Sequence, residues 1–253
     1  MLIILSPAKK QKFTNCSFKE QNPLNFPSET EELITHLREY SQEEIQKLME
    51  ISPELAALNQ QRFKDFDITY NTNSKSPAVL AFQGDAYRSL QAQDFNESEQ
   101  EFCQKHLAII SGLYGLLNPY DLIQPYRLEM KTKIKTENAN NLYEFWGDKI
   151  SIALATKMKN HENKTIINLA SDEYAKVIQK STLKNPIIKV DFKEHKNDKY
   201  QTIGIHAKKA RGSMTRYIIK NKLTECEQIT KFNCDNYKFN SNLSTVDNYV
   251  FTR

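Results

Sequence analysis

The sequence predicts a mixed α/β (α+β) fold in a single compact domain over residues 1–253, with a small mixed sheet flanked by helices. Two observations predict it. Short apolar runs typical of buried strands alternate with helical segments through the first two-thirds of the chain, and a hairpin follows them. The chain also lacks an internal repeat and a Ser/Gly/Pro-rich linker that would divide it into two domains.

The expected strands are short and apolar, and most are bounded by turn or capping residues. The first, Leu2–Leu5, ends at Ser6-Pro7, and a second follows Pro77. The last two are joined by a polar turn over residues 196–199 and form the predicted hairpin. The expected strands are Leu2–Leu5, Ala78–Phe82, Leu107–Ile110, Thr165–Leu169, Ile187–Phe192 and Tyr200–Ala207.

Helix starts are indicated by capping residues. The pattern Ser-x-x-Glu, in which the two side chains cap each other's backbone N–H groups, occurs at Ser28–Glu31, Ser41–Glu44 and Ser98–Glu101. Ser52 precedes a proline at the first helical position. Each of these four sites is therefore expected to begin a helix, and Ser171-Asp172 is expected to cap a further one.

The composition favours a folded, soluble cytoplasmic protein. Hydrophobic residues make up 39% and charged residues 26%, and no apolar run approaches the roughly 18 residues that span a membrane. The apolar N-terminus lacks the basic segment of a signal peptide. Four cysteines without CxxC spacing are expected to be free thiols: Cys16, Cys103, Cys226 and Cys234. The net charge of +4 is modest, so any basic surface must be a local patch.

Three segments place polar residues after expected strands, where α/β proteins often form their sites. They begin at Ser6, Gln83 and Asn168. Asp85, Asp172 and Glu173, with Tyr87 and Tyr174, could serve as acid–base groups of an enzyme that acts on a nucleobase or nucleotide. The alternative is that Asp85, Ser171 and Asp172 only cap helices.

Two glycines, Gly112 and Gly115, bracket a short apolar step between candidate helices. A helix–hairpin–helix element needs glycine in its turn because the backbone N–H groups must approach a DNA phosphate. Glycines in that element are usually two residues apart, whereas these are three apart. An ordinary turn is therefore the alternative interpretation.

The segment Ala207–Lys220 has helical spacing and no acidic residue between Ile205 and Lys222. Its two faces differ, because Ala210, Met214, Tyr217 and Ile218 form an apolar face and Lys209, Ser213, Arg216 and Lys220 form a polar one. Such a helix can bury one side and offer the other to a polyanion; a solvated surface helix is the alternative. Gly212 inside it is unfavourable by about 1 kcal/mol relative to Ala, so either the helix begins after it or another segment comes close.

No metal and no cofactor are expected. Cys103 and His106 are three residues apart without a second pair of ligands, and His195 and His206 belong to no ligand motif. The sequence also lacks a GxSxG motif, a P-loop and a dinucleotide-binding fingerprint.

Taken together, the motifs resemble the YaaA peroxide-stress family, in order over nearly the whole chain. The matching segments are Leu2–Lys9, Phe82–Asp85 with Tyr87, Leu107–Met130, Phe145–Asp148, Asn168–Tyr174 and Ala207–Gly212. The sequence departs from the family pattern at Lys10, where threonine is usual, and in its Asn/Lys-rich connections.

The resemblance implies a cytosolic protein that is induced in peroxide stress and limits damage from unincorporated iron. It also implies a DNA-binding protein with a positively charged cleft and a helix–hairpin–helix element at Gly112–Gly115. The basic motif of the family corresponds to Lys208, Lys209 and Arg211. To these we add Lys9, Arg88, Arg127 and Arg216 as further cations. The expected partner is double-stranded DNA, including damaged or distorted duplex, bound by a monomer.

Overall fold

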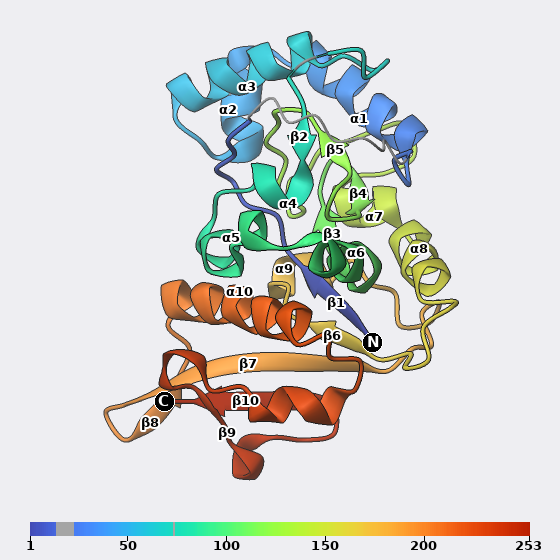
Figure 1. Ribbon diagram of the computed structural model, residues 1–253. Coiled ribbons are helices and arrows are strands. Elements are labelled where there is room, and N and C mark those ends of the chain that lie inside the picture. The colour runs from blue at the N-terminus through green and yellow to red at the C-terminus, as the bar shows by residue number, and fades with distance from the viewer. Residues whose placement is uncertain (14–22, 73) are drawn as a thin grey trace.

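A computed structural model describes residues 1–13, 23–72 and 74–253. Within these residues eight strands form one mixed sheet in the order β4-β3-β1-β6-β7-β10-β9, with β8 paired to β7 (Figure 1). A separate pair, β2 and β5, is antiparallel. The strands are β1 (Leu2–Leu5), β2 (Ser76–Pro77), β3 (Leu107–Ser111), β4 (Gly115–Leu117), β5 (Leu122–Ile123), β6 (Ile166–Asn168), β7 (Ile187–Lys196), β8 (Lys199–Gln201), β9 (Lys238–Phe239) and β10 (Asn248–Thr252).

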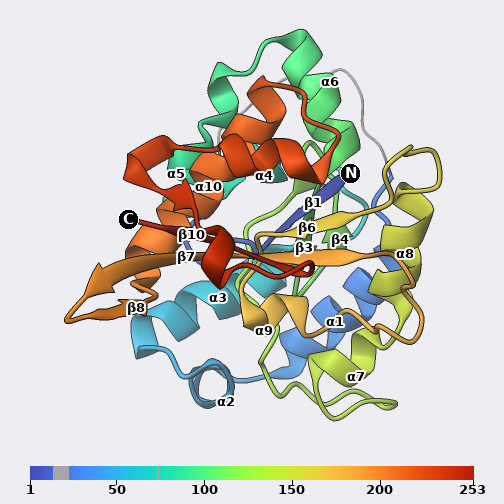
Figure 2. The ribbon, with the colours of Figure 1, turned by 90° about the horizontal axis from the view of Figure 1, so that it is seen from below.

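Helices cover both faces of the sheet, and Figure 2 shows α5, α6 and α10 on one side with α7 and α9 on the other. This arrangement confirms the predicted mixed α+β fold. The α-helices are α1 (Pro27–Glu39), α2 (Gln42–Met49), α3 (Pro53–Asp65), α4 (Ala78–Ala81), α5 (Asp85–Leu90), α6 (Glu97–His106), α7 (Leu142–Trp146), α8 (Lys149–Lys157), α9 (Asp172–Ala175) and α10 (Gly204–Lys220). The 3₁₀ turns are η1 (Ala92–Asp94), η2 (Cys226–Lys231), η3 (Cys234–Asn236) and η4 (Ser241–Leu243).

The first strand lies at the centre of the sheet, parallel to both of its neighbours. Ile3 is in register with Leu107 of β3 and with Ile167 of β6. All four residues of β1 are buried, which explains why the strand is a continuous apolar run rather than an alternating one. Because β1 and β6 are parallel, the segments that follow them leave the sheet at the same edge.

Two of the expected strands are corrected by the structure. The run Ala78–Phe82 is mostly helix α4, because a short apolar run fits a buried helical turn as well as a strand. The run Tyr200–Ala207 is strand only to Gln201, and α10 begins at Gly204. The predicted hairpin turn is confirmed, since Lys196 of β7 pairs with Lys199 of β8.

Two of the expected helix starts are confirmed. Ser41 and Glu44 form a reciprocal capping box at α2, with Glu44 N donating to Ser41 Oγ and Ser41 N donating to Glu44 Oε2 at 2.7 Å. Ser52 caps α3 by accepting a hydrogen bond from Leu55 N at 3.4 Å. These caps satisfy backbone donors that the first helical turn leaves unpaired.

The other two helix starts differ by one or two residues from the prediction. The box of α6 is formed by Asn96 and Glu99 rather than by Ser98–Glu101, because asparagine caps as well as serine does. Helix α1 begins at Pro27 without a side-chain cap, so the Ser28–Glu31 pattern falls inside its first turn.

The cysteines at positions 103, 226 and 234 are free thiols, as expected, and the first two are buried. Cys16 lies outside the described residues. None of the described helices is both long and apolar enough to cross a bilayer.

Candidate functional site

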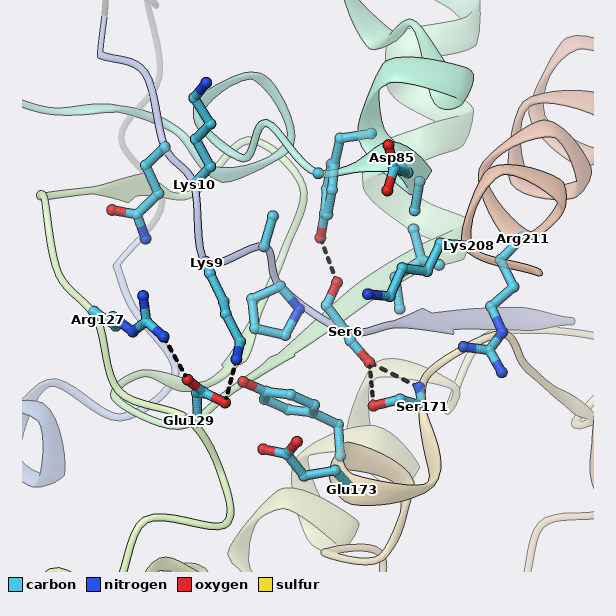
Figure 3. Close-up of a pocket in the computed structure, with 18 of the residues that line it drawn as sticks. Ser6, Lys9, Lys10, Asp85, Arg127, Glu129, Ser171, Glu173, Lys208 and Arg211 are labelled. Carbon is cyan, nitrogen blue, oxygen red and sulfur yellow. Dashed lines mark hydrogen bonds and ion pairs between the residues drawn. The ribbon is translucent and has the colours of Figure 1, made fainter. Parts of the chain in front are cut away.

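A cavity of about 500 Å³ opens where the segments after β1 and β6 meet the start of α5 and the side of α10 (Figure 3). This volume is typical of a site for one small ligand. Five stretches of the chain line the cavity. The first three are Leu5–Gln11, Gly84–Tyr87 and Tyr126–Glu129, the last of these together with Lys131. The fourth consists of Leu169, Ser171, Glu173 and Tyr174, and the fifth of Lys208 and Arg211. The three segments that begin at Ser6, Gln83 and Asn168 therefore all contribute to one cavity, although the segment at Gln83 follows helix α4 and not a strand.

Ser6 joins three of these stretches. Its Oγ accepts a hydrogen bond from Ser171 N at 2.8 Å and donates to Ser171 Oγ at 3.2 Å. Its carbonyl oxygen accepts a hydrogen bond from the Tyr87 hydroxyl at 2.8 Å. Burial raises the pKa of Tyr87 well above its usual value, so the hydroxyl keeps its proton and stays a donor. The floor of the cavity is thus held by protein–protein hydrogen bonds.

The loop after β1 is also fixed by its backbone. Lys12 N donates to Ala81 O, and Gln83 N donates to Lys10 O, each at 2.8 Å. Gly84 lies so close to this loop that a Cβ at position 84 would be 2.9 Å from the Ala8 Cβ. Glycine is therefore required at 84 for the loop and the start of α5 to meet.

A carboxylate, Glu129, lies on one side of the cavity between two cations. Lys9 Nζ is 2.8 Å from Oε2, and Arg127 Nη2 is 3.0 Å from Oε1. The Glu129 side chain is 11% exposed. Burial on its own raises the pKa of Glu129, but hydrogen bonds and charge from Lys9 and Arg127 outweigh it and the net pKa is lowered. Glu129 is therefore ionised near neutral pH.

On the other side of the cavity, Lys208 and Arg211 reach in from the same face of α10, one helical turn apart. Neither forms an ion pair with any acidic side chain in the described part of the chain. Burial lowers the pKa of Arg211, and the charges of Asp191 and Asp172 partly oppose this. The buried Arg211 Nε has no hydrogen-bond partner among the described residues.

Three of the predicted cations do not belong to the cavity lining. Arg88 is paired with Asp85 at 2.6 Å and its side chain is 64% exposed. Arg216 contacts the segment that follows α5, with Nη2 3.5 Å from Asp94 Oδ2 and Nη1 donating to Leu90 O and Gln91 O. Lys209 is exposed but lies outside the lining. Their predicted role in DNA binding therefore does not depend on this cavity, and Lys209 differs from Lys208 because a helix turns successive residues to different faces.

The glycine pair is not a helix–hairpin–helix turn. Gly112 and Gly115 lie in the tight connection of a β-hairpin, with Ser111 of β3 paired to Gly115 of β4. Both are buried. A Cβ at 112 would overlap with Leu128 O, and Gly115 has a positive φ of 66° with the Trp146 ring 2.7 Å from the place of a Cβ. The sequence pattern therefore reflects packing, and these amides do not face solvent.

The three carboxylates that the sequence suggested as acid–base groups do not all face the cavity. Asp85 and Glu173 line the cavity, and Glu173 Oε1 accepts a hydrogen bond from Lys131 N at 3.2 Å. Asp172 points elsewhere, with its side chain 82% exposed and 3.0 Å from Lys189 Nζ. The three acids therefore do not converge, because residues 172 and 173 leave the start of α9 in different directions.

The histidines also have structural neighbours. His206 Nδ1 is 2.5 Å from Glu194 Oε1, and His106 Nδ1 is 2.7 Å from Met1 O. Among the described residues, no three His, Cys, Asp or Glu side chains come together as a set of metal ligands.

Sequence reasoning missed Glu129 and Tyr126. Both occur in the segment that carries Arg127, and the two-residue spacing of Arg127 and Glu129 in extended backbone places both on one side. That spacing was the available signal. The Tyr126 hydroxyl is 2.7 Å from Ser111 Oγ at the end of β3. No local pattern indicates this contact, because it joins different segments.

A family model described as peroxide stress protein YaaA matches residues 1–243 of the chain. Among curated proteins, a UPF0246 protein of Acaryochloris marina is 43% identical over 253 residues and one of Clostridium perfringens is 44% identical over 255. A UPF0246 protein of Francisella philomiragia is 45% identical over 256 residues. In each of these three alignments the match covers 100% of both chains.

Proposed function

We propose that this chain, which belongs to the peroxide stress protein YaaA family, acts in the peroxide response by binding duplex DNA at the mouth of its cavity. The observation that carries the proposal is the pair of cations on α10. Lys208 and Arg211 face the cavity without an acidic partner among the described residues. Cations that are not neutralised within the protein are the groups that replace counterions on a DNA phosphate.

The charge of the cavity lining supports this reading. The lining contains six basic side chains (Lys9, Lys10, Arg127, Lys131, Lys208 and Arg211) and three acidic ones (Asp85, Glu129 and Glu173). The whole chain has 35 Lys and Arg against 31 Asp and Glu. An excess of three charges in one cavity is therefore most of the net charge of the protein, and it is a local patch of the kind that a weakly basic DNA-binding protein needs.

The role in peroxide stress follows from the same electrostatics. Duplex DNA holds a condensed layer of cations along its phosphates. Ferrous iron in that layer would react with peroxide next to the DNA. Lysine and arginine side chains that occupy the phosphates displace cations from this layer, so bound protein lowers the amount of iron held against the bound segment.

The test is the salt dependence of binding to a fluorescent duplex, measured by anisotropy. With about 4–6 phosphate contacts, log affinity falls against log salt with a slope of about −4 to −5. Replacing both Lys208 and Arg211 with alanine weakens binding to all sequences alike and makes the slope less negative by about 2.

The matched control removes two charges elsewhere. Lys231 and Lys238 are exposed and lie outside the cavity lining. Their double alanine variant has the same change in net charge and keeps the wild-type slope. A flat salt dependence of the wild type, or equal weakening by both double variants, contradicts DNA binding at this cavity.

A second candidate function is an enzyme that acts on a nucleobase or nucleotide. The cavity, with Asp85 and Glu173 in its lining, favours this candidate. A screen of nucleotides and damaged DNA, repeated with Asp85→Asn and Glu173→Gln proteins, tests this candidate. Activity that survives both substitutions counts against these carboxylates as acid–base groups.

A further inference from the structure

The two sides of the cavity differ in chemistry. Figure 3 shows Lys208 and Arg211 on one side, Glu129 with Lys9 and Arg127 on the other, and Ser6 between them. The lining also contains apolar and aromatic residues, among them Pro7, Leu169, Tyr126 and Tyr174. A ligand that matches this arrangement has an anionic group at one end, a hydrogen-bonding edge at the other and a flat apolar body between them.

The α10 side suits the anionic end. The Arg211 guanidinium is planar and always charged, and it binds phosphate oxygens through two parallel N–H groups. Its buried Nε has no partner among the described residues. That nitrogen is itself shielded from solvent, so a phosphate in the cavity would be bound by the terminal Nη groups of the same guanidinium. Lys208, which reaches the same part of the cavity, adds a second positive charge.

The Glu129 side suits a donor. Ionised carboxylates only accept hydrogen bonds. Lys9 and Arg127 each use one oxygen of Glu129, and each oxygen has a second lone pair. An amino group that enters from the cavity can therefore bind there, whereas a carbonyl oxygen at the same place faces a negative charge.

We propose that the cavity holds one nucleotide turned out of the bound DNA, with its phosphate on Lys208 and Arg211 and its base at Glu129. This inference rests on the proposed DNA binding. A volume of about 500 Å³ lies in the range of pockets that hold one small ligand, and a single nucleotide is of that size. The carboxylate selects bases with an exocyclic amino group, namely adenine, cytosine and guanine, over thymine.

The experiment compares duplexes that differ at one position. One duplex is fully paired, and four others contain a single unpaired dA, dC, dG or dT opposite an abasic site. Removing an unpaired nucleotide from the stack costs least, so these duplexes bind best if the cavity takes one nucleotide. Anisotropy at fixed salt is expected to give about tenfold tighter binding for unpaired dA, dC and dG than for the paired duplex, with dT weaker than the other three.

Variants then assign the two sides. Arg211→Ala is expected to remove the preference for an unpaired nucleotide. Glu129→Gln is expected to reduce the discrimination between dC and dT, because a glutamine amide both donates and accepts. Glu162→Gln, at an exposed carboxylate outside the lining, is the control and keeps both preferences.

A measurement on the wild-type protein keeps the test independent of how the variants fold. With 2-aminopurine as the unpaired base, bound protein is expected to shield its fluorescence from quenching by acrylamide. Tight binding to all five duplexes alike, with 2-aminopurine still open to acrylamide, overturns the nucleotide cavity while DNA binding stands. Absence of binding to every duplex removes the proposed function itself.

Discussion

The backbone of Gly212 in α10 lies directly against the carbonyl oxygen of Ala86 in α5, and a Cβ at position 212 would overlap with that oxygen. Helices α5 and α10 form neighbouring parts of the cavity wall, so this contact sets how close Asp85 on one helix lies to Arg211 on the other. Glycine within a helix is unfavourable by about 1 kcal/mol relative to alanine. The close helix contact outweighs that cost, and it answers why glycine occurs inside the basic helix.

The first prediction is that Gly212→Ala destabilises the protein although alanine favours helix. The two helices must move apart, and overpacking of this kind costs about 1–3 kcal/mol. We expect a lower melting temperature by several degrees in a protein of this size. Gly204→Ala is the matched control, because nothing lies within 4 Å of a Cβ there. A stable Gly212→Ala protein with a wild-type melting curve would contradict this reading of the contact.

A second prediction tests whether Gly115, in the turn between β3 and β4, serves packing or contacts DNA. Gly115→Ala places a Cβ against Trp146 at a positive φ, so we expect a loss of stability of about 2–4 kcal/mol. The fraction that remains folded binds duplex DNA with wild-type affinity, because Gly115 is buried. Denaturant unfolding and anisotropy below the unfolding transition measure the two effects. If a fully folded Gly115→Ala protein bound DNA more weakly than the wild type, the turn would be part of the DNA interface.

The third prediction concerns pH. His161 is 5% exposed, and its two ring nitrogens have no hydrogen-bond partner among the described residues. Burial, and then the charge of neighbouring His106, lower the pKa of His161 to about 4. The unfolded chain therefore binds a proton below pH 6.5 that the folded protein does not bind until about pH 4. Stability from this group is present above pH 6.5 and is lost as the pH falls toward 4.

His161→Phe removes this loss. Between pH 7.5 and pH 5 the free energy of unfolding is expected to fall by about 1–2 kcal/mol less in the variant than in the wild type. His106 stays in both proteins, so the difference measures position 161 together with its coupling to His106. Urea unfolding at the two pH values measures it. Parallel curves for the two proteins would show that His161 titrates alike in the folded and unfolded chains.

Sequence patterns predicted the parts of this fold that depend on local chemistry. The run Leu2–Leu5 and the capping box at Ser41 were recognisable because burial on both faces and helix capping leave clear signatures. The run Ala78–Phe82 was not, since four or five apolar residues fit a strand and a helical turn equally. Its helical state depends on distant contacts such as Ala78 N to Asp121 O.

In the cavity, too, the sequence predicted what depends on local patterns and not what depends on distant contacts. Lys9, Arg127, Lys208 and Arg211 were predicted and do line the cavity. Which cations stay unpaired could not be predicted, because their acidic partners come from other elements far along the chain. Helix α10 shows this directly. Arg216 and Lys220 were predicted on the same polar face as Lys209. In the structure Arg216 is paired with Asp94, just before α6, and Lys220 with Glu99 within α6.

The last prediction uses that contrast within α10. Arg216 donates hydrogen bonds to the carbonyl oxygens of Leu90 and Gln91 at 3.1 and 3.0 Å, and its guanidinium lies 5.8 Å from the centre of the Phe95 ring. Arg216→Ala is therefore expected to cost about 1–2 kcal/mol of stability and to leave DNA affinity within twofold of wild type. Lys208→Ala is expected to do the opposite, with weaker binding at every salt concentration and an unchanged melting temperature. Thermal melting and anisotropy on the same two proteins check both statements. If Arg216→Ala weakened DNA binding as much as Lys208→Ala did, the DNA interface would not be confined to the cavity-facing side of α10 and would extend along the whole helix.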